Sequence, residues 1–213
     1  MVSSQDHKRA YDGDMGPNTG GMGTFSPSRV YTPDIAKEVK KTIMEPTIRA
    51  MNQEGCPFKG VLYFGLILTE KGAKVLEYNA RFGDPETQVI LPRLKTDLVD
   101  IFLAIIDEKL DKIDIQWENN AAVCVILASG GYPGNYKKGY EISGLEALEN
   151  SPDTLVFHAG TIKKNGKYYT NGGRVLGITA IASDLDKAVT KAYEKVKLVS
   201  FTDMHYRTDI GKR

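Results

Sequence analysis

The chain has 213 residues, of which 41% are hydrophobic and 26% are charged, as is usual for a globular protein with its own core. Its 28 Lys and Arg residues nearly balance its 27 Asp and Glu residues, and a net charge of +1 provides no field to attract nucleic acid or an anionic membrane. The longest apolar run, residues 121–128, is too short to span a bilayer, and the first residues lack the apolar segment of a signal peptide. We therefore expect a cytoplasmic protein with neither a nucleic-acid nor a membrane partner.

The cysteines and histidines indicate no disulfide framework and no zinc site. Cys56 and Cys124 lie far apart in or near apolar stretches, so we interpret them as two buried free thiols. His7, His158 and His205 lack ligand spacing and are interpreted as a loop, a strand and a surface residue.

The chain opens with a short polar stretch, residues 3–9, that leads directly into a glycine-rich run, residues 12–23. No predicted helix or strand precedes this run to anchor it. We therefore expect the sequence to enter in the middle of a fold.

The next predicted elements are helices and a strand pair. Thr32 is a suitable N-cap for a helix with Pro33 in its first turn, and Pro46 is expected to kink or restart that helix. Residues 60–69 are predicted to form a buried strand, and residues 73–79 a second strand after a turn. A helical stretch after residue 86 and a helix at about 96–109 are expected to follow.

A polar segment, residues 107–120, marks the predicted domain boundary, and we place the two domains at residues 1–116 and 117–213. Beyond it, strands are predicted at 121–128, 155–162, 167–170 and 173–182, with Asn165-Gly166 as a hairpin turn. Residues 184–199 have the spacing of an amphipathic helix. The expected fold class is α+β: an antiparallel sheet with helices, then a second small α+β domain.

The residues with the clearest chemical pattern are Glu77, Asn79 and Arg81. Strand side chains alternate, so these three leave one face of the strand if it extends that far. Carboxylate and amide oxygens suit Mg²⁺, which usually takes one or two protein ligands plus substrate phosphates, and Arg81 can fork onto phosphoryl oxygens. Spacing alone also allows an ordinary solvent-facing role, but the charged segment at residues 81–86 favours a site.

The glycine-rich run is the second candidate site. Its five glycines in residues 12–23 allow close backbone approach and can direct N–H groups at an anion, while Asp12 and Asp14 could orient an ammonium or hydroxyl group. A flexible loop or linker is the alternative. The glycine spacing fits neither a Walker A nor a Rossmann motif.

Three motifs in order resemble one family. Residues 5–9, 12–23 and 81–88 closely resemble the phosphoribosylamine–glycine ligases, or glycinamide ribonucleotide synthetases, of the ATP-grasp superfamily. The similarity continues through residues 128–134, 171–176 and 206–211 and so covers essentially the whole chain. It corresponds to roughly the second half of the family enzyme: the C-terminal part of the ATP-grasp domain and the C-terminal domain.

The resemblance implies an ATP-dependent carbon–nitrogen ligase of purine synthesis. Such enzymes join glycine to 5-phosphoribosylamine through glycyl phosphate, releasing ADP and phosphate. By this match Glu77 and Asn79 are expected to bind Mg²⁺ (or Mn²⁺) with ATP, and Arg81 to stabilise the transferring phosphoryl group. Loop closure over glycine and the ribose phosphate would exclude water. The expected substrate-binding residues are Asp12, Asp14, Asn18, Thr19, Gly20, Gly21, Met22, Gly23, Asp84 and Glu86.

Two features depart from the family pattern or leave roles open. Many ATP-grasp enzymes carry an acidic ligand on the preceding strand, and residues 63–67 have none. Arg174 could approach the ligand or be an ordinary arginine at a strand start. Because most nucleotide-gripping residues would belong to an N-terminal half that is missing, we predict that this polypeptide alone has no ligase activity.

Two other functions remain possible on the sequence. The first is another ATP-grasp carboxylate–amine ligase or a carboxylase, against which residues 83–86 and 18–23 favour glycine by resemblance only. The second is a non-catalytic binding module, which would have no reason to keep Glu77, Asn79 and Arg81 on one face.

Overall fold

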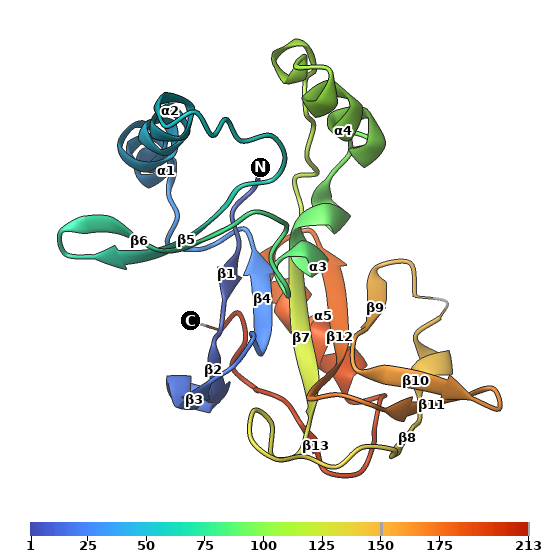
Figure 1. Ribbon diagram of the computed structural model, residues 1–213. Helices are drawn as coiled ribbons and strands as arrows, with labels where there is room; N and C mark the ends of the chain where they lie inside the picture. The colour runs from blue at the N-terminus through green and yellow to red at the C-terminus, as the bar shows by residue number, and fades with distance from the viewer. Residues whose placement is uncertain (150, 213) are drawn as a thin grey trace. The chain divides into compact units, whose positions relative to one another are not determined.

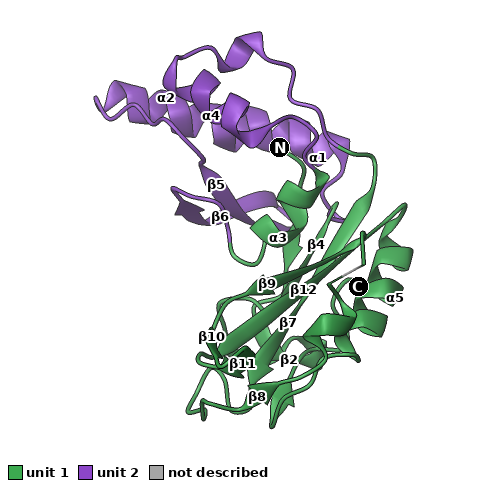
Figure 2. Ribbon diagram, turned by 90° about the vertical axis from the view of Figure 1, so that its right-hand side faces the viewer, with its two compact units in different colours: residues 1–27, 84–93, 118–213 green, residues 28–83, 94–117 purple. Residues whose placement is uncertain are grey.

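The computed structural model describes residues 1–149 and 151–212, which form two compact units (Figure 2). Unit 1 comprises Met1–Pro27, Asp84–Arg93 and the segment from Glu118 onward. Unit 2 comprises Ser28–Gly83 and Leu94–Trp117. The chain therefore passes twice from one unit to the other, and each unit is described by itself.

Unit 1 is built on an antiparallel sheet of six strands in the order β1-β4-β7-β12-β9, with β13 also paired to β7 (Figure 1). The strands at 121–128 and 173–182 are confirmed as its centre. The N-terminal residues belong to the same sheet, since Thr24 of β4 pairs with Cys124 of β7. The strand bounds are β1 Gln5–Asp6, β4 Gly23–Ser26, β7 Ala121–Ser129, β9 Thr154–His158, β12 Arg174–Ala182 and β13 Met204–His205.

Strand β7 is buried along its whole length because both faces of the sheet are covered. Val123, Val125 and Leu127 belong to the main hydrophobic core with the inner face of helix α5 (Leu185–Val196). On the alternate positions, Cys124 lies beside Thr179, whose hydroxyl donates to the Gln88 carbonyl of helix α3 (Thr87–Ile90) at 3.1 Å. A continuous apolar run, rather than an alternating one, follows from this double cover.

Helix α5 confirms the amphipathic pattern of residues 184–199. Asp184 is its N-cap and accepts a hydrogen bond from the Lys187 N–H at 2.9 Å. Ala188, Ala192 and Val196 are buried against the sheet. Small residues at these positions let the helix approach the strands closely.

A hairpin and a short strand form a second sheet in unit 1, in the order β10-β11-β8. Both turn residues of the predicted hairpin, Asn165 and Gly166, have positive φ values of 49° and 80°, as a type I′ turn requires. The single strand expected at 155–162 is wrong: it divides into β9 and β10 at Gly160, where a Cβ would lie 2.5 Å from the Gly172 Cα. The bounds are β8 Glu141–Ile142, β10 Thr161–Lys164 and β11 Lys167–Thr170.

The first part of the glycine-rich run forms a small hairpin of β2 (Arg9–Tyr11) and β3 (Met15–Asn18) around a 3₁₀ turn, Asp12–Asp14. Gly13 and Asp14 have positive φ values of 72° and 57°, which fits the tolerance of Gly and Asp for this region. The run is therefore ordered structure rather than a linker.

In unit 2 the predicted N-terminal helix is confirmed and is divided as expected. Helix α1 (Pro33–Val39) is capped by Thr32, whose hydroxyl accepts from the Ile35 N–H at 3.3 Å. A π-helical turn, Lys40–Met44, connects it to α2 (Glu45–Gln53), which has Pro46 in its first turn. The restart lies where proline cannot donate a hydrogen bond.

The strand pair of unit 2 is confirmed as β5 (Tyr63–Thr69) and β6 (Gly72–Asn79), but the prediction of a buried strand is wrong. Residues of β5 are half-buried or exposed, because β5 and β6 form a ribbon of two strands. Helix α4 (Leu98–Ile106) is shorter than the expected 96–109 and is capped by Asp97. Short 3₁₀ turns lie at Leu91–Arg93, Leu110–Lys112 and Leu145–Ala147.

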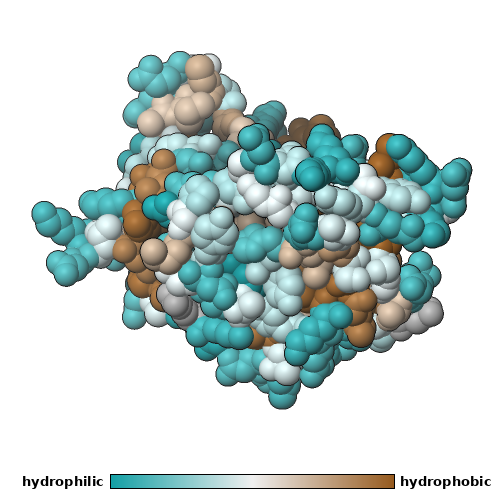
Figure 3. Space-filling view, turned by 90° about the horizontal axis from the view of Figure 1, so that it is seen from below, coloured by the Kyte–Doolittle hydropathy of each residue, from teal (hydrophilic) through white to brown (hydrophobic). Residues whose placement is uncertain are grey.

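Charged and polar residues are distributed over the surface, and Figure 3 shows one face on which hydrophilic residues predominate and hydrophobic atoms form separate patches. Among the described residues, none of the helices has the length and hydrophobicity needed to cross a membrane. Of the two predicted buried thiols, Cys124 is buried and Cys56 is exposed. The domain boundary at 116/117 concerns the domains of the family enzyme and stays a prediction.

Candidate functional site

Glu77 and Asn79 lie side by side at the end of β6, on the same side of the ribbon. The Asn79 side-chain nitrogen donates to the Glu77 carboxylate at 3.4 Å. Tyr78, between them, instead contacts Phe64 of β5 edge to face, with ring centroids 5.4 Å apart. The alternation of side chains along the strand therefore holds where it was expected to bring the acid and the amide together.

A glycine makes room for the Glu77 side chain. Gly65 is its cross-strand partner, and a Cβ on Gly65 would lie 2.7 Å from the Glu77 Cγ. The ribbon has a register shift directly after this pair, between Gly65 and Leu66. The preceding strand thus contributes no acidic ligand, and in its place it leaves the space over which Glu77 lies.

Arg81 follows the pair outside the strand. Its guanidinium donates to the Phe82 carbonyl at 2.7 Å, and the side chain is exposed. No hydrogen bond connects Arg81 to Glu77 or Asn79 in the part of the chain that the structure describes. The strand ends at Asn79, so strand alternation does not govern the direction of Arg81.

The donor set of this ribbon fits a magnesium ion that is completed by phosphates and water. Asn79 donates through its amide nitrogen, which leaves its Oδ1 available as a second oxygen ligand beside the Glu77 carboxylate. Among the described residues, no group of three or more His, Cys, Asp or Glu side chains could hold a metal alone. Two protein oxygens match the way Mg²⁺ is usually held with a nucleotide.

The two aspartates of the glycine-rich run, in unit 1, bind the C-terminal segment of the chain. Asp12 accepts a hydrogen bond from the Thr208 N–H at 2.7 Å and another from the Thr208 hydroxyl. Asp14 accepts from the Arg207 guanidinium at 2.9 Å. Both carboxylates, expected to bind substrate, therefore hold the hairpin to residues 207–208 in this structure.

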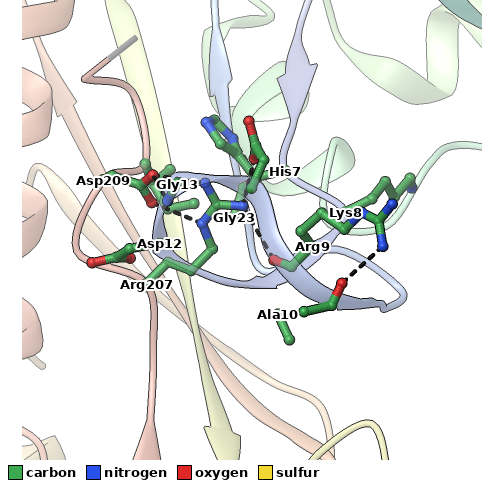
Figure 4. A network of polar contacts seen from close by, with 12 residues as sticks. His7, Lys8, Arg9, Ala10, Asp12, Gly13, Gly23, Arg207 and Asp209 are labelled. Atoms are coloured by element: carbon green, nitrogen blue, oxygen red, sulfur yellow. Dashed lines mark hydrogen bonds and ion pairs between the residues drawn. The ribbon is translucent and has the colours of Figure 1, made fainter.

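Arg207 is the centre of that network, as Figure 4 shows. It is completely buried, and its guanidinium forms two hydrogen bonds with Asp209, at 2.7 and 2.8 Å, and a third with the Arg9 carbonyl at 3.1 Å. Asp209 also accepts from the Gly13 N–H at 2.9 Å. Burial alone would raise the pKa of Asp209, but the hydrogen bonds from Arg207 and Gly13 outweigh it and hold this pKa well below its ordinary value.

The second half of the glycine-rich run approaches β1 and the sheet. The Thr19 N–H and hydroxyl both donate to the Lys8 carbonyl, at 2.7 and 2.8 Å, and the Gly21 N–H donates to the Thr19 hydroxyl at 2.9 Å. Met22 and Gly23 are buried. The expected substrate contact of the Met22 side chain is therefore replaced by a core position, whereas Asn18 and Gly20 are exposed.

Arg174 combines the two roles that the sequence left open. It begins β12, and its guanidinium donates to the Gly20 carbonyl at 3.0 Å and to the Asp84 carbonyl and carboxylate at 3.1 Å each. The Gly20 N–H donates to the Tyr132 hydroxyl at 3.0 Å. Arg174 and Tyr132 therefore fix the glycine-rich run beside Asp84, within unit 1.

Two carboxyl groups are buried near one another behind this run. Glu86 is 2% exposed, and its charge, after burial itself, raises the pKa of Asp6 to about 6. Asp6 accepts from the His7 N–H at 2.8 Å and from the Thr24 hydroxyl at 3.2 Å, and forms an ion pair with Lys8 at 2.6 Å. Such burial gives Glu86 no open path to a substrate in this structure, which corrects its expected role.

Exchange of Asp6 for asparagine should remove a pH-dependent loss of stability. The folded protein favours neutral Asp6, so the stabilisation is complete below the ordinary pKa and is lost as the pH rises through about 6. Between pH 4 and 7 the free energy of unfolding of the wild-type chain should fall by roughly 2–3 kcal/mol relative to Asp6→Asn, measured by urea denaturation.

The difference between the two proteins isolates Asp6. His7 has a lowered pKa, caused by burial and then by the charge of Arg207, so its contribution is lost as the pH falls and has the opposite sign. His7 is present in both proteins and cancels in the difference. A difference that stays constant over this pH range would contradict the assignment.

Comparison with known families decides the relationship of the chain. Residues 1–87 match the model of the ATP-grasp (A) domain of phosphoribosylglycinamide synthetase, and residues 122–213 match the model of its C domain. The chain belongs to the phosphoribosylglycinamide synthetase family.

Members of the family resemble the chain over its whole length. It is 51% identical over 213 residues to the phosphoribosylamine–glycine ligase of Halalkalibacterium halodurans, which covers 100% of the chain and 49% of the relative. For the Synechocystis enzyme the identity is 48% over 215 residues, with 51% of the relative covered. The solved structure of the Thermotoga maritima ligase is 37% identical, has a TM-score of 0.84, and is matched over 97% of this chain and 50% of that one.

The chain therefore corresponds to the C-terminal portion of the phosphoribosylglycinamide synthetases and spans about half the length of the curated relatives it matches. The predicted fold class, α+β with an antiparallel sheet, is confirmed by the family structure. Sequence reasoning did not assign roles to Asp6, Tyr132, Arg207 and Asp209. Their only signal was their position inside motifs that resemble the family, because their partners lie far away in the sequence.

Proposed function

We propose that this chain forms the C-terminal half of a phosphoribosylamine–glycine ligase, which joins glycine to 5-phosphoribosylamine with ATP. The supporting observation is the adjacency of the Glu77 and Asn79 oxygens on one side of the ribbon, at 3.4 Å, with Gly65 leaving space above Glu77. Relatives about 50% identical over the same residues carry that name. A cytoplasmic location stays a prediction.

In this proposal Glu77 and Asn79 hold the divalent cation that accompanies ATP. The ion, Mg²⁺ or Mn²⁺, neutralises phosphate charge when bound. Arg81, exposed beside the ribbon end, turns from the Phe82 carbonyl to the transferring phosphoryl group and stabilises its charge. The glycine carboxylate attacks the γ-phosphorus to give glycyl phosphate and ADP, and the amine of phosphoribosylamine then displaces phosphate.

The glycine-rich run supplies the acceptor side of the proposal. Its exposed residues Asn18 and Gly20 and the half-buried Thr19 can face the glycine or the ribose phosphate, and Asp84 beside Gly20 carries the remaining charge. The network around Arg207 holds the first half of the run, and Arg174 holds the second half. A run fixed at both ends needs little ordering when ligands bind.

The proposal is tested by ADP release from two proteins: this chain alone, and the chain fused behind the N-terminal half of the Halalkalibacterium halodurans ligase. We expect no ligase activity from the chain alone, and release that requires both glycine and phosphoribosylamine from the fusion. Release by the chain alone would overturn the prediction of inactivity. Release by the fusion with bicarbonate or another acid in place of glycine would favour another ATP-grasp ligase or a carboxylase.

A further inference from the structure

Helix α4 of unit 2 presents a stripe of large apolar side chains to solvent. Val99 is 60% exposed, Leu103 54% and Ile106 68%, and Phe102 and Leu110 are also exposed. Positions 99, 102, 103 and 106 are spaced by three and four residues, so they share one side of the helix. These residues form the α4 stripe.

The opposite side of the same helix is already used within the chain. Ile101 and Ala104 are buried. Asp100, the one charged residue between Leu98 and Ile106, lies beside the stripe rather than in it. A helix that is apolar on both sides is typical of one buried between two bodies, and isolated surface leucines do not produce such a stripe.

The β5–β6 ribbon gives a second, independent sign that unit 2 lacks a neighbour. Its two strands pair only with each other among the described residues, so their outer edges have free backbone groups. Leu76 is 67% exposed and Tyr78 is 50% exposed on β6. A ribbon of two strands is marginally stable in water, and further strands or a helix are needed to cover it.

The occupant is indicated by the extent of the relatives. They carry about as much chain again outside the matched half, and the model of the ATP-grasp domain matches residues on this ribbon. We propose that the α4 stripe and the β5–β6 ribbon form the docking surface for the N-terminal half of the enzyme, and that this half binds when it is supplied as a separate chain. The inference rests on family membership and does not require the proposed ligase activity.

The test is co-expression of this chain with the tagged N-terminal half of the Halalkalibacterium halodurans ligase, without added substrates. We expect a one-to-one complex by sedimentation. We also expect slower hydrogen exchange at residues 98–106 in the complex than in the chain alone. The double variant Val99→Glu/Leu103→Glu should bind at least about 30-fold more weakly, because two apolar contacts are replaced by charges.

Leu198→Glu is the matched control, since Leu198 is 47% exposed but belongs to unit 1. It should leave the affinity unchanged, and circular dichroism should show that both variants keep the wild-type fold. Three results would overturn the proposal: no complex, a complex that tolerates the α4 variant, or self-association of the chain through the α4 stripe. Because binding is measured without ATP or glycine, these results are independent of the activity assay.

Discussion

Replacing Glu77 with alanine in the complete ligase, with this chain as its C-terminal half, is expected to lower kcat at least about 10²-fold. The substitution removes the one carboxylate of the oxygen pair and leaves Asn79 alone to hold the cation. Glu77 is exposed and its one printed contact is with Asn79, so the free energy of unfolding should change little. Steady-state ADP release and urea denaturation measure the two quantities.

Glu70→Ala is the control for this prediction. Glu70 is exposed in the turn of the same ribbon, between β5 and β6, away from the strand end that carries Asn79. It should retain turnover within about twofold of the wild type. Near-normal turnover of Glu77→Ala would instead support a binding module without catalysis.

Replacing Arg207 with methionine is expected to destabilise the isolated chain by about 3–5 kcal/mol, because a buried ion pair loses one partner. Asp209, only 14% exposed, would keep its charge without the guanidinium that now donates to both of its oxygens. The Asp14 carboxylate and the Arg9 carbonyl would also lose their hydrogen bonds. Urea denaturation at pH 7 measures the effect.

The pH dependence of that effect has a defined sign. The pKa of Asp209 is lowered in the folded protein, so its stabilisation is present above the ordinary pKa of an aspartate and is lost as the pH falls further. The difference between wild type and Arg207→Met should therefore shrink in acid. Arg9→Met, which removes an exposed hydrogen bond to the Gly16 carbonyl, should cost less than about 1.5 kcal/mol. Equal costs for the two arginines would contradict a central role for Arg207.

Features fixed by neighbouring residues could be predicted from the sequence. The adjacency of Glu77 and Asn79 follows from strand alternation alone, and the caps of α1 and α5 follow from Thr32 and Asp184. The Asn165-Gly166 turn is similarly local, since both residues tolerate positive φ.

Features fixed by distant residues could not be predicted. Nothing near Asp14 in the sequence indicates Arg207, which lies 193 residues away. The exposure of β5 depends on what else pairs with the ribbon, and an apolar run cannot show this. Burial of Met22 and Glu86 likewise depends on the packing around β7, so their expected contacts with substrate were wrong in kind.

The central claim is that the Glu77 and Asn79 oxygens hold the cation of ATP. A crystal structure of the complete ligase with a non-hydrolysable ATP analogue and Mg²⁺ tests it most directly. We expect an oxygen from each side chain at roughly 2.1 Å from an ion that also contacts the phosphates. An ion bound by other residues, with both side chains turned away from it, would contradict the claim.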